Sequence, residues 1–292
     1  MNPLNYSSDS KLYARIMTLL ESSFPGIEHM AETSITLGTR WADSSRPFCI
    51  FDAAEQPIAH LGLIELPITV QNKPYNIATL HAICTHPDYR KRGHFKTLMN
   101  EALNFIDNHY QGAQLFTKQP SLYEPFGFRK IQEFKFSFNL NSASFKPEKR
   151  YYFRNLNLQD AYDRNLIQSL LSIRAPVSAE YGIREEQNVF LFNMLQNQAY
   201  YNEDLDLCVV YKIENEILHL YDIVSSNYRS INDILPGINQ SFQQVITYFS
   251  PDKWSFGRPH EVSPLVAECH LMARGKWLPR DFTIAVPMTA HC

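Results

Sequence analysis

Three basic residues and one glycine, Arg90, Lys91, Arg92 and Gly93, lie between a stretch that favours a β-strand and one that favours a helix. The preceding residues, 77–85, are mostly apolar, and after the glycine apolar residues recur at helical spacing. The first N–H groups of a helix lack partners and carry partial positive charge, and glycine lets a phosphate approach the backbone closely. These residue types in this order predict a binding site for a diphosphate.

The candidate diphosphate site extends from the end of the predicted strand into the first turn of the predicted helix. Basic side chains of the turn would add to the positive charge of the backbone N–H groups. A solvated basic loop is the alternative, because a single glycine before a helix is weak evidence, and these residues alone leave both interpretations open. The residues assigned to the site are Ile83, Cys84, Thr85, Arg90, Lys91, Arg92, Gly93, His94, Phe95 and Lys96.

The spacing of this turn resembles motif A of the GCN5-related N-acetyltransferase (GNAT) superfamily. That motif consists of Arg or Gln, two residues, Gly, one residue, and then Gly or Ala. Arg90 and Gly93 match it, whereas Phe95 departs from it and instead begins the apolar stripe of the predicted helix. Acetyltransferases of the enhanced-intracellular-survival type resemble the sequence more closely, because they also carry a bulky apolar residue there.

A second segment, residues 122–128 with the sequence Leu-Tyr-Glu-Pro-Phe-Gly-Phe, resembles motif B of the same superfamily. In that motif a short helix delivers a tyrosine close to the thioester sulfur, and Tyr123 occupies the matching place. The competing interpretation is a half-buried aromatic residue with its hydroxyl at the surface. Between the two motifs, residues 114–117 supply a short strand that should splay from strand 77–85 and leave a slot for pantetheine.

The resemblance implies an N-acetyltransferase that moves an acetyl group from acetyl-CoA to a primary amine of a small molecule or peptide. A mostly protonated amine must lose a proton before it attacks, and Glu65 and His81 are the candidate bases, with a water relay as the alternative. Backbone N–H groups at the end of strand 77–85 would stabilise the oxyanion, and Tyr123 would protonate the leaving thiolate. A non-catalytic acyl-CoA-binding or scaffolding module is the rival function, and a longer acyl group stays open.

Composition limits the class of protein. The 292 residues suffice for two domains, and the formal net charge of −3 leaves no large basic field for nucleic acid. No segment resembles a signal peptide or a membrane span, so a cytoplasmic location without a membrane partner is expected. The five scattered cysteines form no disulfide or metal-ligand pattern, so no metal is expected.

The order of predicted elements indicates an α/β (α+β) protein of two GNAT-like domains, each with a mixed, mostly antiparallel sheet flanked by helices. The division is placed in the polar stretch 139–149, which gives a catalytic domain at 1–146 and a degenerate domain at 147–292. In the first, a helix ends at residues 24–26, and strands follow at 48–51 and 58–70. In the second, the expected strands and helices cover residues 151–154, 160–173, 185–195, 207–213, 217–224, 231–242 and 245–249.

The second predicted domain has a poorer counterpart of the diphosphate site. Residues 225–230 contain no glycine and one basic residue, so only the first domain should bind the cofactor and the second should form a wall of the acceptor site. Its excess of acidic residues would steer a cationic amine toward the slot, and a solvated acidic face is the alternative. Residues 283–287 are expected to form a last strand and residues 288–292 a frayed tail; the alternative is a tail folded back with its free carboxylate toward the slot.

Overall fold

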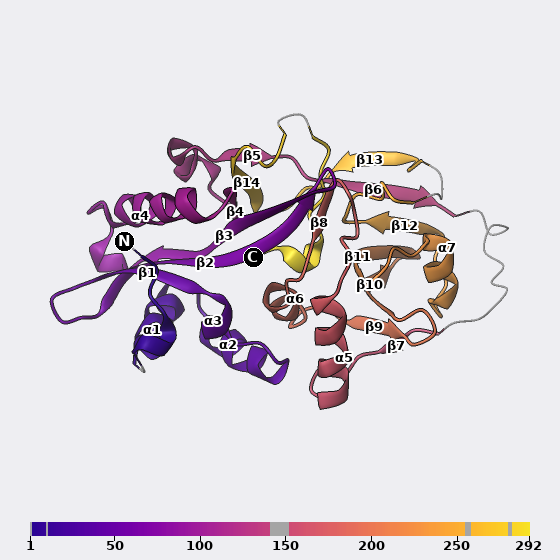
Figure 1. Ribbon diagram of the computed structural model, residues 1–292, viewed down its shortest axis with the longest axis horizontal. Coiled ribbons are helices and arrows are strands. Elements are labelled where there is room, and N and C mark those ends of the chain that lie inside the picture. Colours follow the sequence, from indigo (N-terminus) through magenta and orange to yellow (C-terminus); the bar gives the residue numbers. More distant parts are fainter. Residues whose placement is uncertain (1, 10, 141–151, 255–257, 280–281) are drawn as a thin grey trace.

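The computed structural model describes residues 2–9, 11–140, 152–254, 258–279 and 282–292, and these form two seven-stranded mixed sheets that lie side by side (Figure 1). The first sheet has the order β1-β2-β3-β4-β14-β5, with β8 paired to β2. Its strands are β1 (Arg46–Phe51), β2 (Pro57–Val70), β3 (Lys73–Thr85), β4 (Gly112–Thr117), β5 (Arg129–Ile131), β8 (Tyr181–Ile183) and β14 (His270–Gly275).

Helices cover both faces of the first sheet (Figure 1). The apolar stripe of α4 (His94–His109) packs on β2 and β3 through residues such as Leu98, Met99 and Ala102. On the opposite face, α1 (Leu12–Ser23) packs through Ile16 and Leu20, followed by α2 (Ile27–Thr36) and the short α3 (Trp41–Ser44). The first sheet is therefore a buried layer between helices, as the helical spacing of apolar residues along α1 and α4 predicts.

The second sheet has the order β13-β6-β12-β11-β10-β9-β7 and repeats part of the first. In both sheets a long antiparallel pair is followed by a parallel strand, β2-β3-β4 in one and β10-β11-β12 in the other. The prediction of two mixed, helix-flanked α/β modules is thus confirmed. The second set comprises β6 (Phe134–Asn139), β7 (Arg154–Asn155), β9 (Ala199–Asn202), β10 (Leu207–Glu214), β11 (Ile217–Ser225), β12 (Gln244–Thr247), β13 (Glu261–Pro264), α5 (Ala161–Ser172), α6 (Asn188–Asn193) and α7 (Ile231–Ile234).

Strands are exchanged between the two halves of the chain. β6 precedes residue 146 but belongs to the second sheet, whereas β8 and β14 follow it and belong to the first. In Figure 1 the yellow-brown β14 stands between the violet β4 and the later β5. A cut at residue 146 therefore does not separate the sheets, and the predicted boundary itself falls within residues 141–151, outside the described part of the chain.

Three predicted elements differ from the structure. Within the described residues, the strand expected over 151–154 begins only at Arg154 and ends at Asn155. The helix expected over 231–242 ends at Ile234, because Pro236 and Gly237 follow in a 3₁₀ turn (Leu235–Gly237) that cannot continue an α-helix. The strand expected over 283–287 is reduced to one bridge between Ile284 and Glu133. Among the helices of the described ranges, none is both long enough and apolar enough to cross a bilayer.

Candidate active site

An opening in the first sheet lies between β3 and β4. The two strands pair in parallel only from Ala78 with Ala113 to Leu80 with Leu115. β3 then continues to Thr85, and in the described residues its edge facing β4 has no further strand partner. The backbone N–H and C=O groups along this edge are consequently available to a ligand, as the predicted splay of the two strands requires.

A β-bulge marks the point where the two strands separate. His60 and Gly62 of β2 are opposite Cys84 and His81, so β3 carries one extra residue there, and Ala82 adopts a left-handed φ of 49°. The bulge is held by His60, whose Nδ1–H donates to the Ala82 carbonyl at 2.8 Å. Complete burial lowers the pKa of His60 to about 4 and keeps its ring neutral. Bulges of this kind redirect the backbone next to active sites.

The N-terminus of α4 lies just beyond the end of β3. Its N-cap Gly93 has a φ of 86°, and a Cβ placed there would meet no atom within 4 Å. No side chain caps the helix, and the first N–H group to bond within it is that of Thr97, which donates to the Gly93 carbonyl. The N–H groups of His94, Phe95 and Lys96 are therefore the ones that an incoming anion would meet.

The predicted cations of the turn divide into two kinds. Arg90 donates from Nε to the Thr85 carbonyl at 3.1 Å, and Arg92 donates from Nη2 to the Asp88 carbonyl at 2.9 Å, so both shape the loop. Lys91 and Lys96 are exposed. All four contribute positive charge at the helix start.

The last strand residues before the turn point to different faces. Ile83 packs toward α4 together with Phe95, on the side of the helix start. Cys84 packs toward α1, and burial raises the pKa of its thiol to about 11. For Cys84, only the backbone therefore faces the candidate site.

Tyr123 lies next to the start of α4, between two short 3₁₀ turns (Pro120–Leu122 and Glu124–Phe126). Its ring contacts Phe95 edge to face at 5.7 Å between centroids, so the two predicted motifs meet in space. Burial raises the pKa of Tyr123 to about 12, and its hydroxyl therefore keeps its proton at neutral pH.

The two predicted bases are not brought together. Glu65 is exposed, accepts a hydrogen bond from Asn76 Nδ2 at 2.8 Å, and lines a polar pocket of about 490 Å³ with residues 185–188 of the second half. Glu65 is on the same face of β2 as Leu63, which packs on α4. Gly62, which pairs with His81 of β3, is on the opposite face of β2. Because side chains alternate along a strand, only His81 lies on the face where the bulge opens.

His81 is buried and held tightly. Its ring lies against Gly62, where a Cβ would be 2.4 Å from Nε2, and its Nε2 shares a hydrogen bond of 2.9 Å with Ser45 Oγ. Burial, and then the charge of His60, lower the pKa of His81 to about 3, so the ring is neutral. Its Nδ1 has no hydrogen-bond partner within the described part of the chain.

A pocket of about 510 Å³ lies on this face, and His81 and Ala82 form part of its wall. We call it the apolar pocket. Local sequence patterns gave no sign of it, because its walls come from five separate segments that meet only in the folded chain. Its lining residues are Ser23, Phe24, Pro25, Ile27, Met30, Ala31, Trp41, His81, Ala82, Phe192 and Cys292.

The last residues of the sequence are packed, so the expectation of a frayed tail is wrong. A 3₁₀ turn (Met288–Ala290) is buried against α6, where Asn193 Nδ2 donates to the carbonyls of Thr289 and His291 at 3.1 and 3.0 Å. The His291 ring stacks on Phe116 of β4 with centroids 4.3 Å apart. Since Cys292 also lines the apolar pocket with Ala82, this segment contacts β4 and lies close to the bulge of β3.

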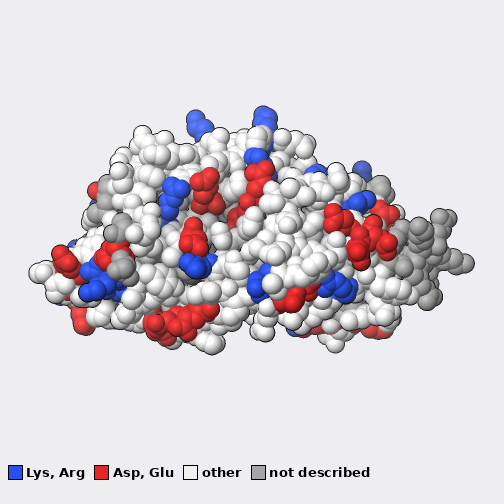
Figure 2. Space-filling view, turned by 60° about the horizontal axis from the view of Figure 1, so that its bottom comes forward, with Lys and Arg blue, Asp and Glu red and all other residues white. Residues whose placement is uncertain are grey.

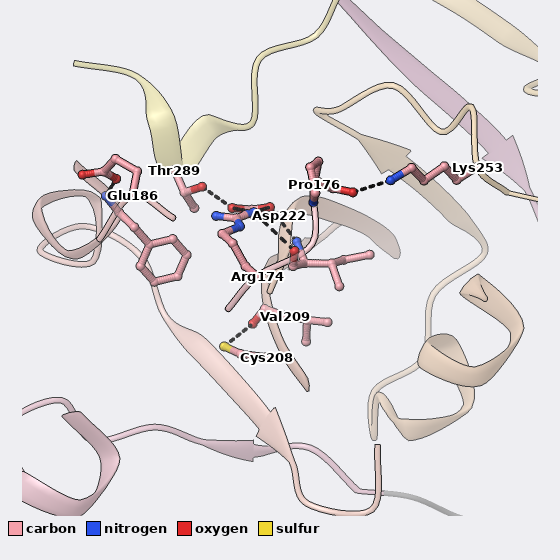
Figure 3. Close-up of polar contacts among 10 residues, drawn as sticks. Arg174, Pro176, Glu186, Cys208, Val209, Asp222, Lys253 and Thr289 are labelled. Carbon is pink, nitrogen blue, oxygen red and sulfur yellow. Dashed lines mark hydrogen bonds and ion pairs between the residues drawn. The ribbon is translucent and has the colours of Figure 1, made fainter. Parts of the chain in front are cut away.

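A buried ion pair anchors that segment to the second sheet (Figure 3). The Asp222 carboxylate accepts hydrogen bonds from Arg174 Nη2 at 2.8 and 3.1 Å and from the Thr289 hydroxyl. Nearby, buried Glu186 accepts the N–H groups of Val189 and Phe190 at 2.7 and 3.2 Å, which fixes the start of α6. The second half thereby positions both the tail and the helix that carries Phe192.

The second sheet has a matching opening, but it is filled. Beyond the last β11–β12 pair, Leu220 with Thr247, the space beside β11 holds Trp254 and leaves a cavity of about 20 Å³. The N-terminus of α7 is closed by a reciprocal capping box of Ser230 and Asp233. A diphosphate would find neither open N–H groups nor room there.

On the face drawn in Figure 2, Lys and Arg side chains lie singly or in small groups among Asp and Glu side chains. This arrangement matches the small formal net charge of −3. On this face the molecule presents a mixed surface rather than a field of one sign.

Comparison with known proteins identifies the class of the first domain. Residues 9–131 match the family model of the GNAT acetyltransferase domain. Among solved structures, a probable N-acyltransferase of unknown function from Enterococcus faecalis is 12% identical, with 94% of this chain and 71% of that chain covered and a TM-score of 0.58. A search of curated proteins finds no match.

Two further solved structures are similar over most of the chain. Eis1 from Mycobacterium abscessus is 13% identical, with 93% of this chain and 72% of that chain covered and a TM-score of 0.56. A GCN5-related N-acetyltransferase from Anabaena variabilis is 13% identical, with coverages of 91% and 71% and a TM-score of 0.54. Residues 9–131 thus match a GNAT acetyltransferase domain, and the fold of the chain is similar to that of Eis1 and the two other acyltransferase structures.

Proposed function

We propose that this protein transfers an acetyl group from acetyl-CoA to a primary amine of a small molecule or peptide. The observation that carries the proposal is the opening between β3 and β4, which leads directly to the uncapped N-terminus of α4. A diphosphate on the N–H groups of residues 94–96 would direct pantetheine along the free edge of β3 toward the bulge. The GNAT domain match supports the donor.

The bulge and Tyr123 provide the remaining groups for acyl transfer. Backbone N–H groups on the free edge of β3 would stabilise the oxyanion of the tetrahedral intermediate. The leaving thiolate needs a proton, and the Tyr123 hydroxyl, which keeps its proton because of burial, is suited to donate it. This assignment gives each group one role in the transfer.

His81 is a better candidate than Glu65 to handle the proton of the amine. It lines the apolar pocket beside the bulge, and its Nδ1 has no partner in the described chain. With Nε2–H donating to Ser45, Nδ1 is a buried acceptor without a partner in the described chain, so a side-chain movement would have to expose it before it accepted an N–H of the neutral amine. Because its protonated form is strongly disfavoured, His81 would orient the neutral amine, and the proton released on attack would go to water.

Gly93→Asp tests the donor site. The substitution places a carboxylate and a strained φ at the helix start, so measurable binding of acetyl-CoA in calorimetry should disappear. Gly26→Asp is the matched control, since Gly26 is also an N-cap with a φ of 92° and no atom within 4 Å of a Cβ. Unchanged acetyl-CoA affinity in a folded Gly93→Asp variant would contradict the proposed donor site.

A non-catalytic acyl-CoA-binding module is the alternative function. It predicts the same dependence of binding on Gly93 but no release of thiol from acetyl-CoA with any amine. The uncapped helix start supports both functions, whereas Tyr123, buried beside Phe95, favours the enzyme. A thiol-release assay on the full chain with a panel of amines separates them.

A further inference from the structure

We infer that the acceptor of this enzyme is a hydrophobic amine whose aryl or alkyl group occupies the apolar pocket between α1, α2 and α6. The inference rests on the proposed acetyl transfer and specifies its substrate class. Among the residues that the structure describes, no Asp, Glu, Lys or Arg side chain lines the pocket, and its polar side chains include those of a serine, a neutral histidine and a cysteine. Its volume of about 510 Å³ is within the range of small-molecule sites.

The apolar pocket is continuous with the proposed reaction centre. Ala82, the residue at the bulge, lines it, and so does His81 directly before the bulge. Cys292 closes the pocket from the segment that also contacts Phe116 of β4. An amine whose apolar group fills this pocket would thus present its nitrogen at the edge of β3, where the thioester carbonyl is expected.

Aromatic rings form the walls of the pocket. Trp41 contacts His81 edge to face at 4.7 Å and Phe192 at 5.7 Å between centroids. Phe24 and Met30 contribute apolar surface that is 38% and 43% exposed. Aromatic walls can make stacked or edge-to-face contacts with a ring of a ligand, and exposed apolar side chains around a pocket mark a binding site.

The polar pocket that Glu65 lines provides the competing prediction. Its walls carry Asp43, Glu65, Glu185 and Glu186, with Arg46 as a cation, and would favour a cationic polyamine. It borders β2 through Ile64 and Pro67 rather than the free edge of β3. Since β3 separates β2 from the opening to β4, the apolar pocket is better placed for the reaction.

An apolar pocket also fits the chemistry of the attack. Transfer from water into such surroundings disfavours the charged ammonium form, so the bound amine is shifted toward its neutral, nucleophilic form. The pocket thereby lowers the need for a strong base. His81 is a weak base, because burial lowers its pKa to about 3.

The test compares 2-phenylethylamine with spermidine in the thiol-release assay on the full chain. Burial of the phenyl group should give 2-phenylethylamine a kcat/KM at least about 10-fold higher. Met30→Glu should lower that kcat/KM about 10-fold while acetyl-CoA affinity stays unchanged. Ile35→Glu is the matched control, because Ile35 is on the same helix, 53% exposed, and outside the pocket.

The outcomes separate this inference from the proposed function. If spermidine is the better acceptor, or if Met30→Glu and Ile35→Glu behave alike, the hydrophobic acceptor is wrong while acetyl transfer stands. If no amine releases thiol, acetyl transfer is wrong. In that case calorimetry with 2-phenylethylamine still tests the pocket: binding lost in Met30→Glu and kept in Ile35→Glu supports it, and any other pattern overturns it.

Discussion

At the scale of single residues, Tyr123 is the group on which departure of the thiolate would depend. Tyr123→Phe keeps the ring that packs on Phe95 and removes only the hydroxyl. We expect kcat to fall by about 10²-fold, the range of general acid catalysis, while acetyl-CoA affinity holds. Steady-state kinetics with calorimetry checks this. Full turnover in the variant would transfer the role to another residue or to water.

The two buried histidines make stability depend on pH. The folded-state pKa values of His60 and His81, about 4 and about 3, lie below the unfolded value near 6.5, so the unfolded chain takes up protons first as the pH falls. The contribution of these two histidines to the free energy of unfolding is largely present above pH 6.5 and is lost as the pH falls below that value. Each histidine should lower the free energy of unfolding by about 1.4 kcal/mol at pH 5.5 relative to pH 7.5.

Urea unfolding at the two pH values measures this effect. His60→Asn removes one titrating group and retains an amide that can donate to the Ala82 carbonyl. The variant should therefore show about half of the decrease. An equal decrease in variant and parent would assign the pH dependence to other groups.

At the scale of elements, the segment 288–292 closes the site from the opposite side of the opening. Thr289→Val removes the hydroxyl that donates to the buried Asp222 carboxylate and keeps the side-chain shape. The free energy of unfolding should fall by about 1.5–3 kcal/mol, as for a hydrogen bond to a charged group. The acceptor KM should also rise, because the wall that Cys292 forms depends on this anchor.

Thr18→Val is the control for the anchor. Thr18 is exposed on α1 and donates only to the Ala14 carbonyl of its own helix. Denaturant unfolding and acceptor kinetics of this variant should match the parent. If Thr289→Val is as neutral as Thr18→Val, the segment does not contribute to the wall of the acceptor site.

At the scale of the whole molecule, the two related sheets differ in their capacity for the cofactor. The opening beside β11 is filled by Trp254, and α7 caps its own N–H groups through Ser230 and Asp233. Calorimetry should therefore give one acetyl-CoA per chain in the parent and none in Gly93→Asp. A ratio of two, or one remaining site in the variant, would assign a working site to the second sheet.

Local features of this chain could be predicted because they depend on neighbours in sequence. Helical spacing after Gly93 identified α4, and the glycine in a left-handed conformation is the cap that such a turn needs. The divergence of β3 and β4 was also predicted, because two motifs occur on either side of β4 in the order and spacing of the superfamily. The roles of Gly93, Tyr123 and their neighbours stay predictions.

What the sequence by itself determined is thus the class of fold, the glycine turn that begins α4 and the asymmetry between residues 90–93 and 225–230. Only the tertiary structure decided that β14 enters the first sheet, that Glu65 and His81 lie on opposite faces, and that residues 288–292 are packed. The walls of the apolar pocket, from Phe24 to Phe192, were decided there as well. The reason is physical: local patterns specify which face of an element is apolar, whereas long-range packing selects the partner that covers it.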